Sequence, residues 1–248
     1  MTNEPERRLF VAWRRPEGLI VPVGRLIQYT VDGEVRFRFV YLKLAERQQN
    51  FMPLPGLPRL HEVYDSGVLF PVFANRLMPR DRPDYQHFLE QLDLSIEADP
   101  FEVLARSEGV RATDRVEVFP APTRTSDQAL TTLFFARGIR HLDGADERLE
   151  QVAVGDELSL EREPTNPIND RAILMNTRTG ERVGWTPDYL LDLLYELREL
   201  NHSWPTITVE HINDPRTPSH LRLLCRMNAP WPAGYEPFSG PDFLPLAS

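Results

Sequence analysis

Residues 149–173 read LEQVAVGDELSLEREPTNPINDRAI, and they hold the turn, strand and loop signals that decide the fold of the second half of the chain. Gly155-Asp156 predicts a tight turn, since glycine tolerates a positive φ and the aspartate accepts backbone N–H bonds. The alternation of Glu157–Glu161 predicts a half-buried strand. Proline and asparagine fill Glu163–Asp170, which predicts a loop, and Ala172–Asn176 predicts the next strand.

Further short strands are predicted on both sides of this stretch, at 131–139, 182–185, 206–211 and 221–227. Residues 187–200 predict one helix, whose apolar face consists of Tyr189, Leu190, Leu193, Leu194 and Leu197. Short strands joined by Gly-Asp and Asn-Pro turns are typical of small closed barrels. We therefore expect a small β-barrel with a packed helix in the second half.

The first half is also rich in short strands, which are predicted at 9–13, 23–29, 35–41 and 115–119. Asp32-Gly33 is a hairpin signal, and prolines in first turns predict short helices at 83–93 and from Pro100 onward. A Pro/Thr-rich linker puts a domain boundary near 124–129. The expected class is α+β, with a β-rich domain at 1–126 and a second domain at 127–248 that includes the C-terminal strands and a surface tail.

The composition indicates a folded chain without a membrane-spanning helix. The 248 residues are 41% apolar and contain no apolar run near 18 residues. Met1–Arg8 is polar and lacks the apolar core of a secretory signal, so we expect a cytoplasmic protein. The single cysteine, Cys225, allows no internal disulfide and is expected to be a small buried hydrophobe. All basic residues except Lys43 are arginines, which is typical of a GC-rich bacterial genome.

The net charge of −9 lies mainly in residues 129–200, which carry 8 basic and 14 acidic side chains. No segment is strongly basic, so the composition argues against broad electrostatic binding of nucleic acid. Net charge does not fix the local field, and a local cationic patch remains compatible with it. Arg36 and Arg38 alternate along the strand at 35–41 and are interpreted as a solvated strand face.

The motifs of the second half occur in an order that resembles the HIRAN family. Gly138–His141 precede the stretch quoted above, and Gly180–Pro187 follow it, so that the resemblance covers about a quarter of the chain. The resemblance implies a small barrel that recognises DNA, which in the helicase-linked eukaryotic members is the 3′ end of a single strand. It points to seven candidate nucleic-acid-binding residues: Arg140, His141, Asn166, Ile168, Asn169, Arg171 and Trp185.

The candidate residues match the HIRAN pattern at some positions and depart from it at others. Arg140 and His141 occupy the matching cationic end of the first strand. Ile168 stands where the family has a stacking tyrosine, Asn169 where it has an aspartate that receives the terminal hydroxyl, and Trp185 where it has a histidine. The cation is therefore retained, while the residues that would read the 3′ end are changed.

Each of these side chains also has a purely structural interpretation. Trp185 is either a base-stacking platform or a partly buried barrel residue. Arg140 either contacts phosphate or pairs with an acidic side chain of the following turn, and Arg171 either contacts phosphate or forms an ion pair at the rim. Asn166 is expected to hold its own loop. The acidic partners available to Arg140 are Asp143, Asp146 and Glu147.

Three stretches of the first half are similar to the N-terminal subdomain of HipA-type toxin kinases, namely Val23–Leu26, Phe37–Tyr41 and Leu69–Pro79. The glycine usual after the last proline is missing. No glycine-rich phosphate loop, catalytic Asp–Asn pair or metal-binding Asp motif of a kinase core is present in the sequence. The resemblance implies a β-rich domain that contacts a protein partner.

The sequence carries no catalytic signature, and we expect a non-enzymatic protein without a cofactor. Its six histidines lack metal-ligand spacing, and no nucleophile-elbow motif occurs. The first hypothesis is a DNA-associated binding protein whose HIRAN-like module recognises single-stranded or distorted DNA ends. The alternative is a protein-interaction or regulatory module that docks a kinase, helicase or nuclease without contacting DNA.

Overall fold

The computed structural model describes residues 6–111 and 113–247. The contacts between residues group these into two compact units. The described part of unit 1 comprises residues 6–89, 94–111, 113–121 and 238–247, and unit 2 comprises residues 90–93 and 122–237. Residues 90–93 thus belong to unit 2, although they lie in the first half of the chain, and residues 238–247 belong to unit 1. An expectation of two consecutive domains does not include these two segments. Residues 1–5 of the polar N-terminal stretch lie outside the described residues.

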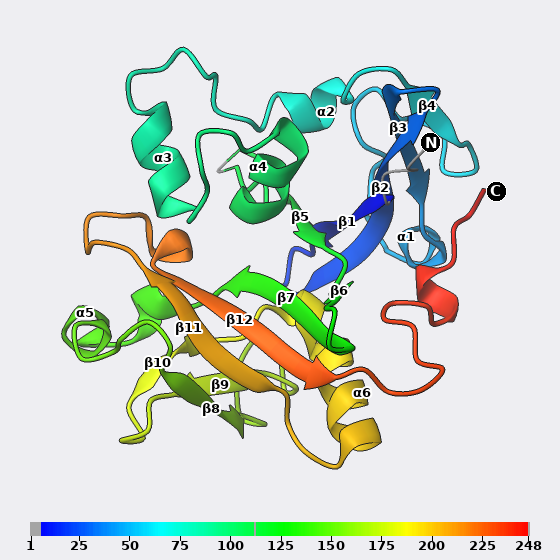
Figure 1. The fold of residues 1–248 in the computed structure, drawn as a ribbon. Coiled ribbons are helices and arrows are strands. Elements are labelled where there is room, and N and C mark those ends of the chain that lie inside the picture. The colour runs from blue at the N-terminus through cyan, green and yellow to red at the C-terminus, as the bar shows by residue number, and fades with distance from the viewer. Residues whose placement is uncertain (1–5, 112, 248) are drawn as a thin grey trace. The chain divides into compact units, whose positions relative to one another are not determined.

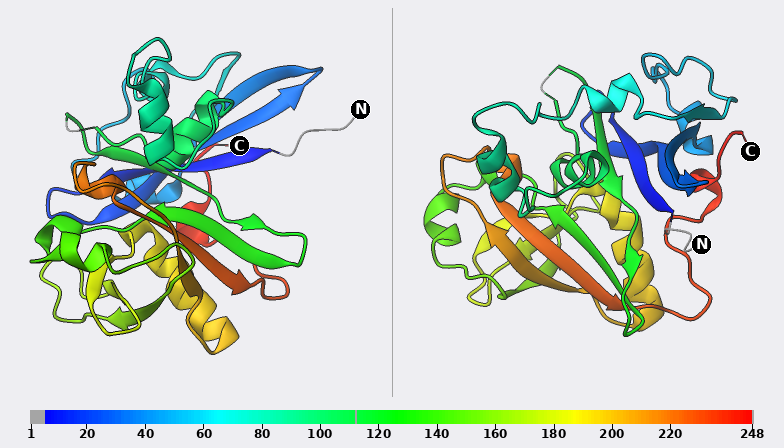
Figure 2. Two further views of the ribbon diagram at one scale, coloured as in Figure 1. Left: turned by 60° about the vertical axis from the view of Figure 1, so that its left-hand side comes forward. Right: turned by 45° about the horizontal axis from the view of Figure 1, so that its top comes forward.

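Unit 1 is built on a five-stranded antiparallel sheet of order β4-β3-β2-β1-β5 (Figure 1). Its strands are β1 (Arg7–Arg14), β2 (Ile20–Val31), β3 (Glu34–Tyr41), β4 (Tyr64–Ser66) and β5 (Val116–Pro120). Asp32 and Gly33 both adopt positive φ in the predicted hairpin turn between β2 and β3. The tip of this hairpin projects from the sheet in the left-hand view of Figure 2.

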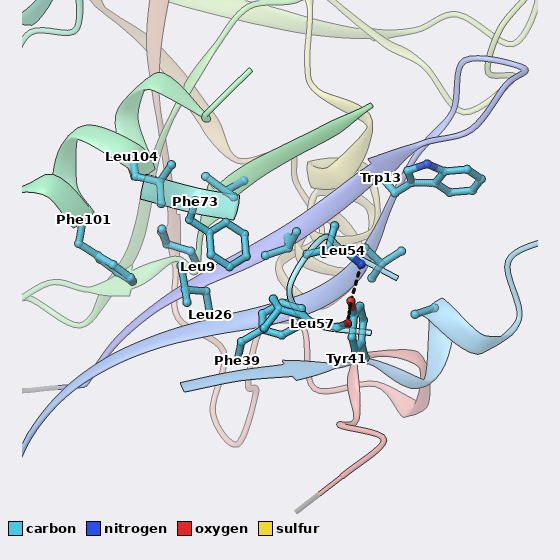
Figure 3. Close-up of a cluster of buried hydrophobic side chains, with 14 residues drawn as sticks. Leu9, Trp13, Leu26, Phe39, Tyr41, Leu54, Leu57, Phe73, Phe101 and Leu104 are labelled. Atoms are coloured by element: carbon cyan, nitrogen blue, oxygen red, sulfur yellow. Dashed lines mark hydrogen bonds between the residues drawn. The ribbon is translucent and has the colours of Figure 1, made fainter. Parts of the chain in front are cut away.

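The inner face of this sheet follows from strand alternation. Leu9 pairs with Leu26, which pairs with Phe39, so these three buried side chains form one row across β1, β2 and β3. Gly24 lies beside this row, and a Cβ there would lie 2.5 Å from the Phe39 ring. Figure 3 shows the row within the core, where Phe73 and Leu104 from the helical segments cover it.

The helices of unit 1 are short: α1 (Lys43–Glu46), α2 (Pro71–Ala74) and α4 (Pro100–Ser107). A further helix, α3 (Tyr85–Gln91), begins in unit 1, and its last two residues belong to unit 2. Asp99 caps α4 by accepting the N–H bonds of Phe101 at 2.8 Å and Glu102 at 2.9 Å. Partial burial alone would raise the pKa of Asp99, but the bonds from Glu102 and from Arg7 outweigh it and lower the pKa. The prediction of a proline-initiated helix from residue 100 is confirmed.

The C-terminal segment packs within unit 1. Phe238 and Phe243, which ends the 3-10 helix η4 (Pro241–Phe243), pack against Phe10 with ring centroids 5.0 and 5.6 Å away. Leu246 N–H donates to the Tyr41 carbonyl at 2.8 Å. Apolar burial and backbone pairing therefore attach this tail to the first sheet.

Unit 2 contains a seven-stranded antiparallel sheet of order β10-β9-β8-β11-β12-β7-β6 (Figure 1). Together with unit 1 it confirms the predicted α+β class, with two antiparallel sheets. The strands are β6 (Thr123–Arg124), β7 (Ala129–Phe135), β8 (Glu157–Arg162), β9 (Ile173–Asn176), β10 (Arg182–Trp185), β11 (Thr206–Ile212) and β12 (Leu223–Pro230).

The predicted closed barrel is wrong, because no continuous strand ladder joins the two ends of this sheet within the described residues. The strand expected at 131–139 ends at Phe135, and Ile139 lies in a 3-10 helix, η1 (Ile139–His141). Gly138 adopts a left-handed conformation with φ of 70° and turns the chain. Only an isolated bridge, Arg137 with Trp185, then reaches β10 from the segment after β7.

The remaining helices of unit 2 are α5 (Ala145–Leu149), η2 (Asp188–Leu190), α6 (Leu191–Asn201) and η3 (Ser219–Leu221). The helix expected at 187–200 is observed as η2 followed by α6. All five residues of its predicted apolar face are buried: Tyr189, Leu190, Leu193, Leu194 and Leu197. Among the described residues, no helix has the length and apolar character needed to cross a membrane.

We predict that Tyr41→Phe destabilises unit 1. The buried Tyr41 hydroxyl accepts from Leu54 N–H at 2.6 Å and donates to the Leu57 carbonyl at 2.7 Å (Figure 3). Its loss leaves both groups unpaired in the core, so the free energy of unfolding should fall by about 1–3 kcal/mol. Urea denaturation followed by circular dichroism measures the change.

Tyr64→Phe is the matched control for this prediction. The Tyr64 hydroxyl makes the same pair of bonds, to the N–H and carbonyl of Arg59, but on an exposed surface where water replaces it. Its loss should cost less than about 1 kcal/mol. Equal losses in the two variants would contradict the assignment of the Tyr41 cost to burial.

Candidate nucleic-acid interface

The candidate residues gather around a close approach of two chain segments in unit 2. Arg137 and Trp185 exchange backbone hydrogen bonds of 2.8 and 2.9 Å. A Cβ at Gly184 would lie 3.0 Å from the Arg137 carbonyl oxygen, and a Cβ at Gly138 would overlap the Trp185 ring. Gly184 therefore allows the two chain segments to approach closely, and Gly138 serves the same purpose on the opposite segment.

Trp185 is held in place on two sides, and this favours its structural interpretation. Its ring lies against the backbone of Gly138, and its Nε1–H donates to a carboxylate oxygen of Glu163 at 2.7 Å. The side chain is half-buried. Trp185 thus links the η1 corner to the loop that follows β8, and sequence reasoning did not single out Glu163 as its partner.

The loop at 163–171 is ordered by its own asparagines. Asn166 donates to Glu163 at 2.7 Å and accepts the N–H groups of Ile168 and Asn169 at 3.0 and 3.2 Å. The prediction that Asn166 holds its own loop is confirmed. Asn169 donates to Asp188 at 3.0 Å and accepts the N–H of Arg171 at 3.0 Å, so it joins the loop to η2. Ile168 is left 56% exposed at the tip.

Arg140 and His141 lie exposed at the end of η1. The Arg140 Nε–H donates to the Nε2 of His141 at 3.1 Å, which requires that ring nitrogen to be unprotonated. No described carboxylate forms a salt bridge with Arg140, and Asp146, one of its expected partners, pairs instead with the buried Arg222. The terminal nitrogens of Arg140 therefore face solvent without an anion among the described residues.

Arg171 forms the ion pair that was one of its two predicted interpretations. Its guanidinium lies 2.6 Å from Asp192 and 4.9 Å from the ring centroid of Tyr195, both on α6. Arg162 lies over the same ring at 5.7 Å. The sequence analysis did not identify Tyr195, because this residue is not on the apolar face of α6. An aromatic residue on the polar face of a helix was the signal that could have indicated a contact with arginine.

The structure also bears on Cys225, on the turn at Gly155-Asp156 and on metal binding. Cys225 is fully buried in β12, and burial raises the pKa of its thiol, as expected for a small buried hydrophobe. Asp156 accepts the Ala153 N–H at 2.8 Å beside Gly155, which has a φ of 90°, so the predicted turn is confirmed. Within residues 6–111 and 113–247 no group of three His, Cys, Asp or Glu side chains is arranged to hold a metal ion.

Comparison with known proteins gives one weak structural likeness. No protein-family model matches the chain, and no curated protein sequence matches it. Among solved structures, the crystal structure of the HIRAN domain of human HLTF is similar to 40% of this chain and 74% of that chain, with 19% identity and a TM-score of 0.32. A TM-score this low does not establish a shared fold. The resemblance of the three first-half stretches, Val23–Leu26, Phe37–Tyr41 and Leu69–Pro79, to the HipA N-terminal subdomain stays a prediction.

We predict that Gly138→Ala destabilises unit 2 more than Gly155→Ala. Both glycines have positive φ, at 70° and 90°, so each substitution carries the cost of a left-handed residue, about 1–2 kcal/mol. At Gly155 nothing lies within 4 Å of the added Cβ, whereas at Gly138 the Cβ meets the Trp185 ring, with Cζ3 at 2.8 Å. Urea denaturation should therefore give a clearly larger loss for Gly138→Ala. Equal losses would mean that the Trp185 contact does not constrain this corner.

Proposed function

We propose that unit 2 binds a single strand of DNA and that the chain acts by binding rather than by catalysis. The observation that carries this proposal is the environment of Arg140, which is exposed and has no carboxylate partner among the described residues. A guanidinium in this state offers two terminal nitrogens in the fork geometry that suits a phosphate group. The HIRAN-like order of the sequence motifs supports the same assignment.

The proposed surface runs from η1 to the loop at 163–171. Trp185 and Glu163 connect these two segments, so the corner that carries Arg140 and the loop that carries Ile168 are held together within unit 2. Ile168 offers an exposed apolar contact, and Arg171 lies beyond it on the same loop. In this proposal Arg140 contacts a phosphate, and Arg171 contacts a second one through the guanidinium nitrogens that its bond to Asp192 does not use. Ile168 contacts a sugar or base, while Trp185 and Asn166 position the loop.

The acidic character of residues 129–200 limits the expected affinity. Their charge of −6 opposes long-range attraction of DNA, so we expect weak binding that depends on a few local contacts. With two phosphates bound, the logarithm of the association constant should fall with the logarithm of salt concentration with a slope of about −1.4.

We predict that Arg140→Ala weakens binding of fluorescently labelled single-stranded DNA roughly tenfold, because a charged hydrogen bond to phosphate is lost. The salt slope should become shallower by about 0.7. Fluorescence anisotropy at two salt concentrations measures both quantities. Arg178→Ala, in the exposed β9–β10 turn at the opposite end of β10 from Trp185, is the matched control and should leave both unchanged.

Blocking the 3′ end of the DNA separates end recognition from general strand binding. Because Ile168 and Asn169 differ from the HIRAN pattern, we expect the blocked and free strands to bind alike. Failure of the wild-type chain to bind either strand at micromolar concentration and low salt would reject the proposal. The alternative, a module that docks a protein partner without contacting DNA, would then be favoured.

A further inference from the structure

The outer face of the unit 1 sheet carries four arginines on three adjacent strands. Residues directly opposite one another across antiparallel strands share a face, as do residues two apart along a strand. One row consists of Arg8, Ile27, Arg38 and Asp65; its neighbours are Phe10, Arg25 and Val40 on one side, and Tyr29 and Arg36 on the other. Most of these residues belong to β2 and β3, the hairpin whose ribbon Figure 2 shows.

Two of the four arginines are engaged by carboxylates. Arg38 donates to both oxygens of Asp65, at 2.9 and 3.3 Å, and Tyr29 donates to the same carboxylate at 2.8 Å. Partial burial alone would raise the pKa of Asp65, but these hydrogen bonds outweigh it and lower the pKa. The guanidinium of Arg38 also lies 5.3 Å from the centroid of the Tyr29 ring. Arg8 is bonded to Glu6 at 2.7 Å.

The side chains of the other two arginines, Arg25 and Arg36, have no hydrogen-bond partner among the described residues. The Nε of Arg25 is buried without an acceptor. Partial burial and the nearby Arg8 guanidinium lower the pKa of Arg25, and Glu6 only partly offsets them. The buried Nε is out of reach of a ligand, but an anion at the terminal nitrogens of Arg25 would reduce the repulsion from Arg8.

The spacing of these two arginines sets the size of the ligand. Arg36 pairs with Tyr29, which lies four residues from Arg25 along β2, so their Cα atoms are about 14 Å apart. Side chains stand roughly perpendicular to a sheet, so guanidinium groups on residues this far apart suit two anionic groups of one ligand better than one small anion. Ile27 lies between them and Tyr29 lies directly opposite Arg36, so the ligand also meets an aromatic ring and an apolar side chain.

We propose that this arginine face, defined by Arg8, Arg25, Arg36 and Arg38 with Tyr29 and Ile27, binds the backbone of a single-stranded nucleic acid. Arg25 and Arg36 hold separate phosphates in the fork geometry that guanidinium groups favour. Tyr29 contacts a base or sugar between them, as aromatic side chains on open sheet faces do. A duplex fits less well, because its bases are not free to reach Tyr29.

The C-terminal segment limits the face at one end. Phe238 and Phe243 cover Phe10, which lies opposite Arg25 on β1, so the apolar end of the sheet is already occupied by this chain. The ligand is therefore confined to the part of the face that extends from Arg25 toward the hairpin tip. This surface belongs to unit 1, and its assignment does not depend on the surface proposed on unit 2.

The test uses the full chain and labelled oligothymidylate in fluorescence anisotropy, with Arg25→Gln, Arg36→Gln and the double variant. We expect the double variant to bind roughly tenfold more weakly and its salt slope to become shallower by about 1.4. Arg36→Lys should retain most of the slope, because it keeps the charge. Arg82→Gln is the matched control and should bind normally, since Arg82 is an exposed unit 1 arginine that bonds Asp84 in the loop between α2 and α3 and is not on the sheet.

The outcomes separate this inference from the proposal for unit 2. Loss of binding with Arg140→Ala but not with the double variant would overturn the arginine face and leave the unit 2 proposal standing. Loss with the double variant but not with Arg140→Ala would support the arginine face and contradict the unit 2 proposal. Photo-crosslinking of bromodeoxyuridine-substituted DNA gives an independent answer: adducts within 25–38 support the face, and adducts confined to unit 2 overturn it. Tighter binding of labelled polyglutamate than of DNA, weakened by the same variants, would overturn nucleic acid in favour of an acidic peptide.

Discussion

The arrangement of unit 2 depends on the close approach of two backbone segments at Gly138 and Gly184. Neither position has room for a Cβ without displacing the partner segment, and each has a positive φ that glycine adopts at little cost. This contact lets Arg137 and Trp185 form their isolated bridge. Trp185 then reaches Glu163, and Glu163 in turn fixes Asn166. A steric constraint at two glycines is thereby transmitted to a loop that is distant from both of them in sequence.

The chain uses its arginines in two different ways. Arg76, whose side chain is 2% exposed, donates to the carbonyls of Val72, Gly109 and Val116 and pairs with Asp114, so it ties loop segments together inside unit 1. Arg222 is similarly buried and pairs with Asp146. Arg140 and Arg36, in contrast, are left without carboxylates among the described residues. The same residue type thus stabilises the fold where its five donors are satisfied and is available for an anion where they are not.

A net charge of −9 and local anion binding are compatible because the acidic side chains are not evenly distributed around the arginines. Asp65 and Glu6 neutralise two of the four arginines on the outer face of the first sheet, and the other two lack such partners among the described residues. Short-range contacts decide binding on such a surface, whereas the overall charge mainly slows the approach of a polyanion. Such a surface favours weak association whose salt dependence reflects only a few phosphate contacts.

The sequence by itself determined the elements that depend on local signals. Asp32-Gly33 and Gly155-Asp156 predicted turns, Asp99-Pro100 predicted a helix start, and the period of Tyr189–Leu197 predicted a buried helix face, because turn chemistry and periodicity act over a few residues. It also placed Asn166 correctly in its own loop. Closure of the barrel was predicted wrongly, since strand number and alternation do not show whether the first and last strands meet. The partners of Trp185 and Arg171, the state of Arg140 and the gathering of four arginines on one sheet face were decided only by the tertiary structure. Each depends on strand register and on contacts between residues distant in the chain, which no local pattern encodes.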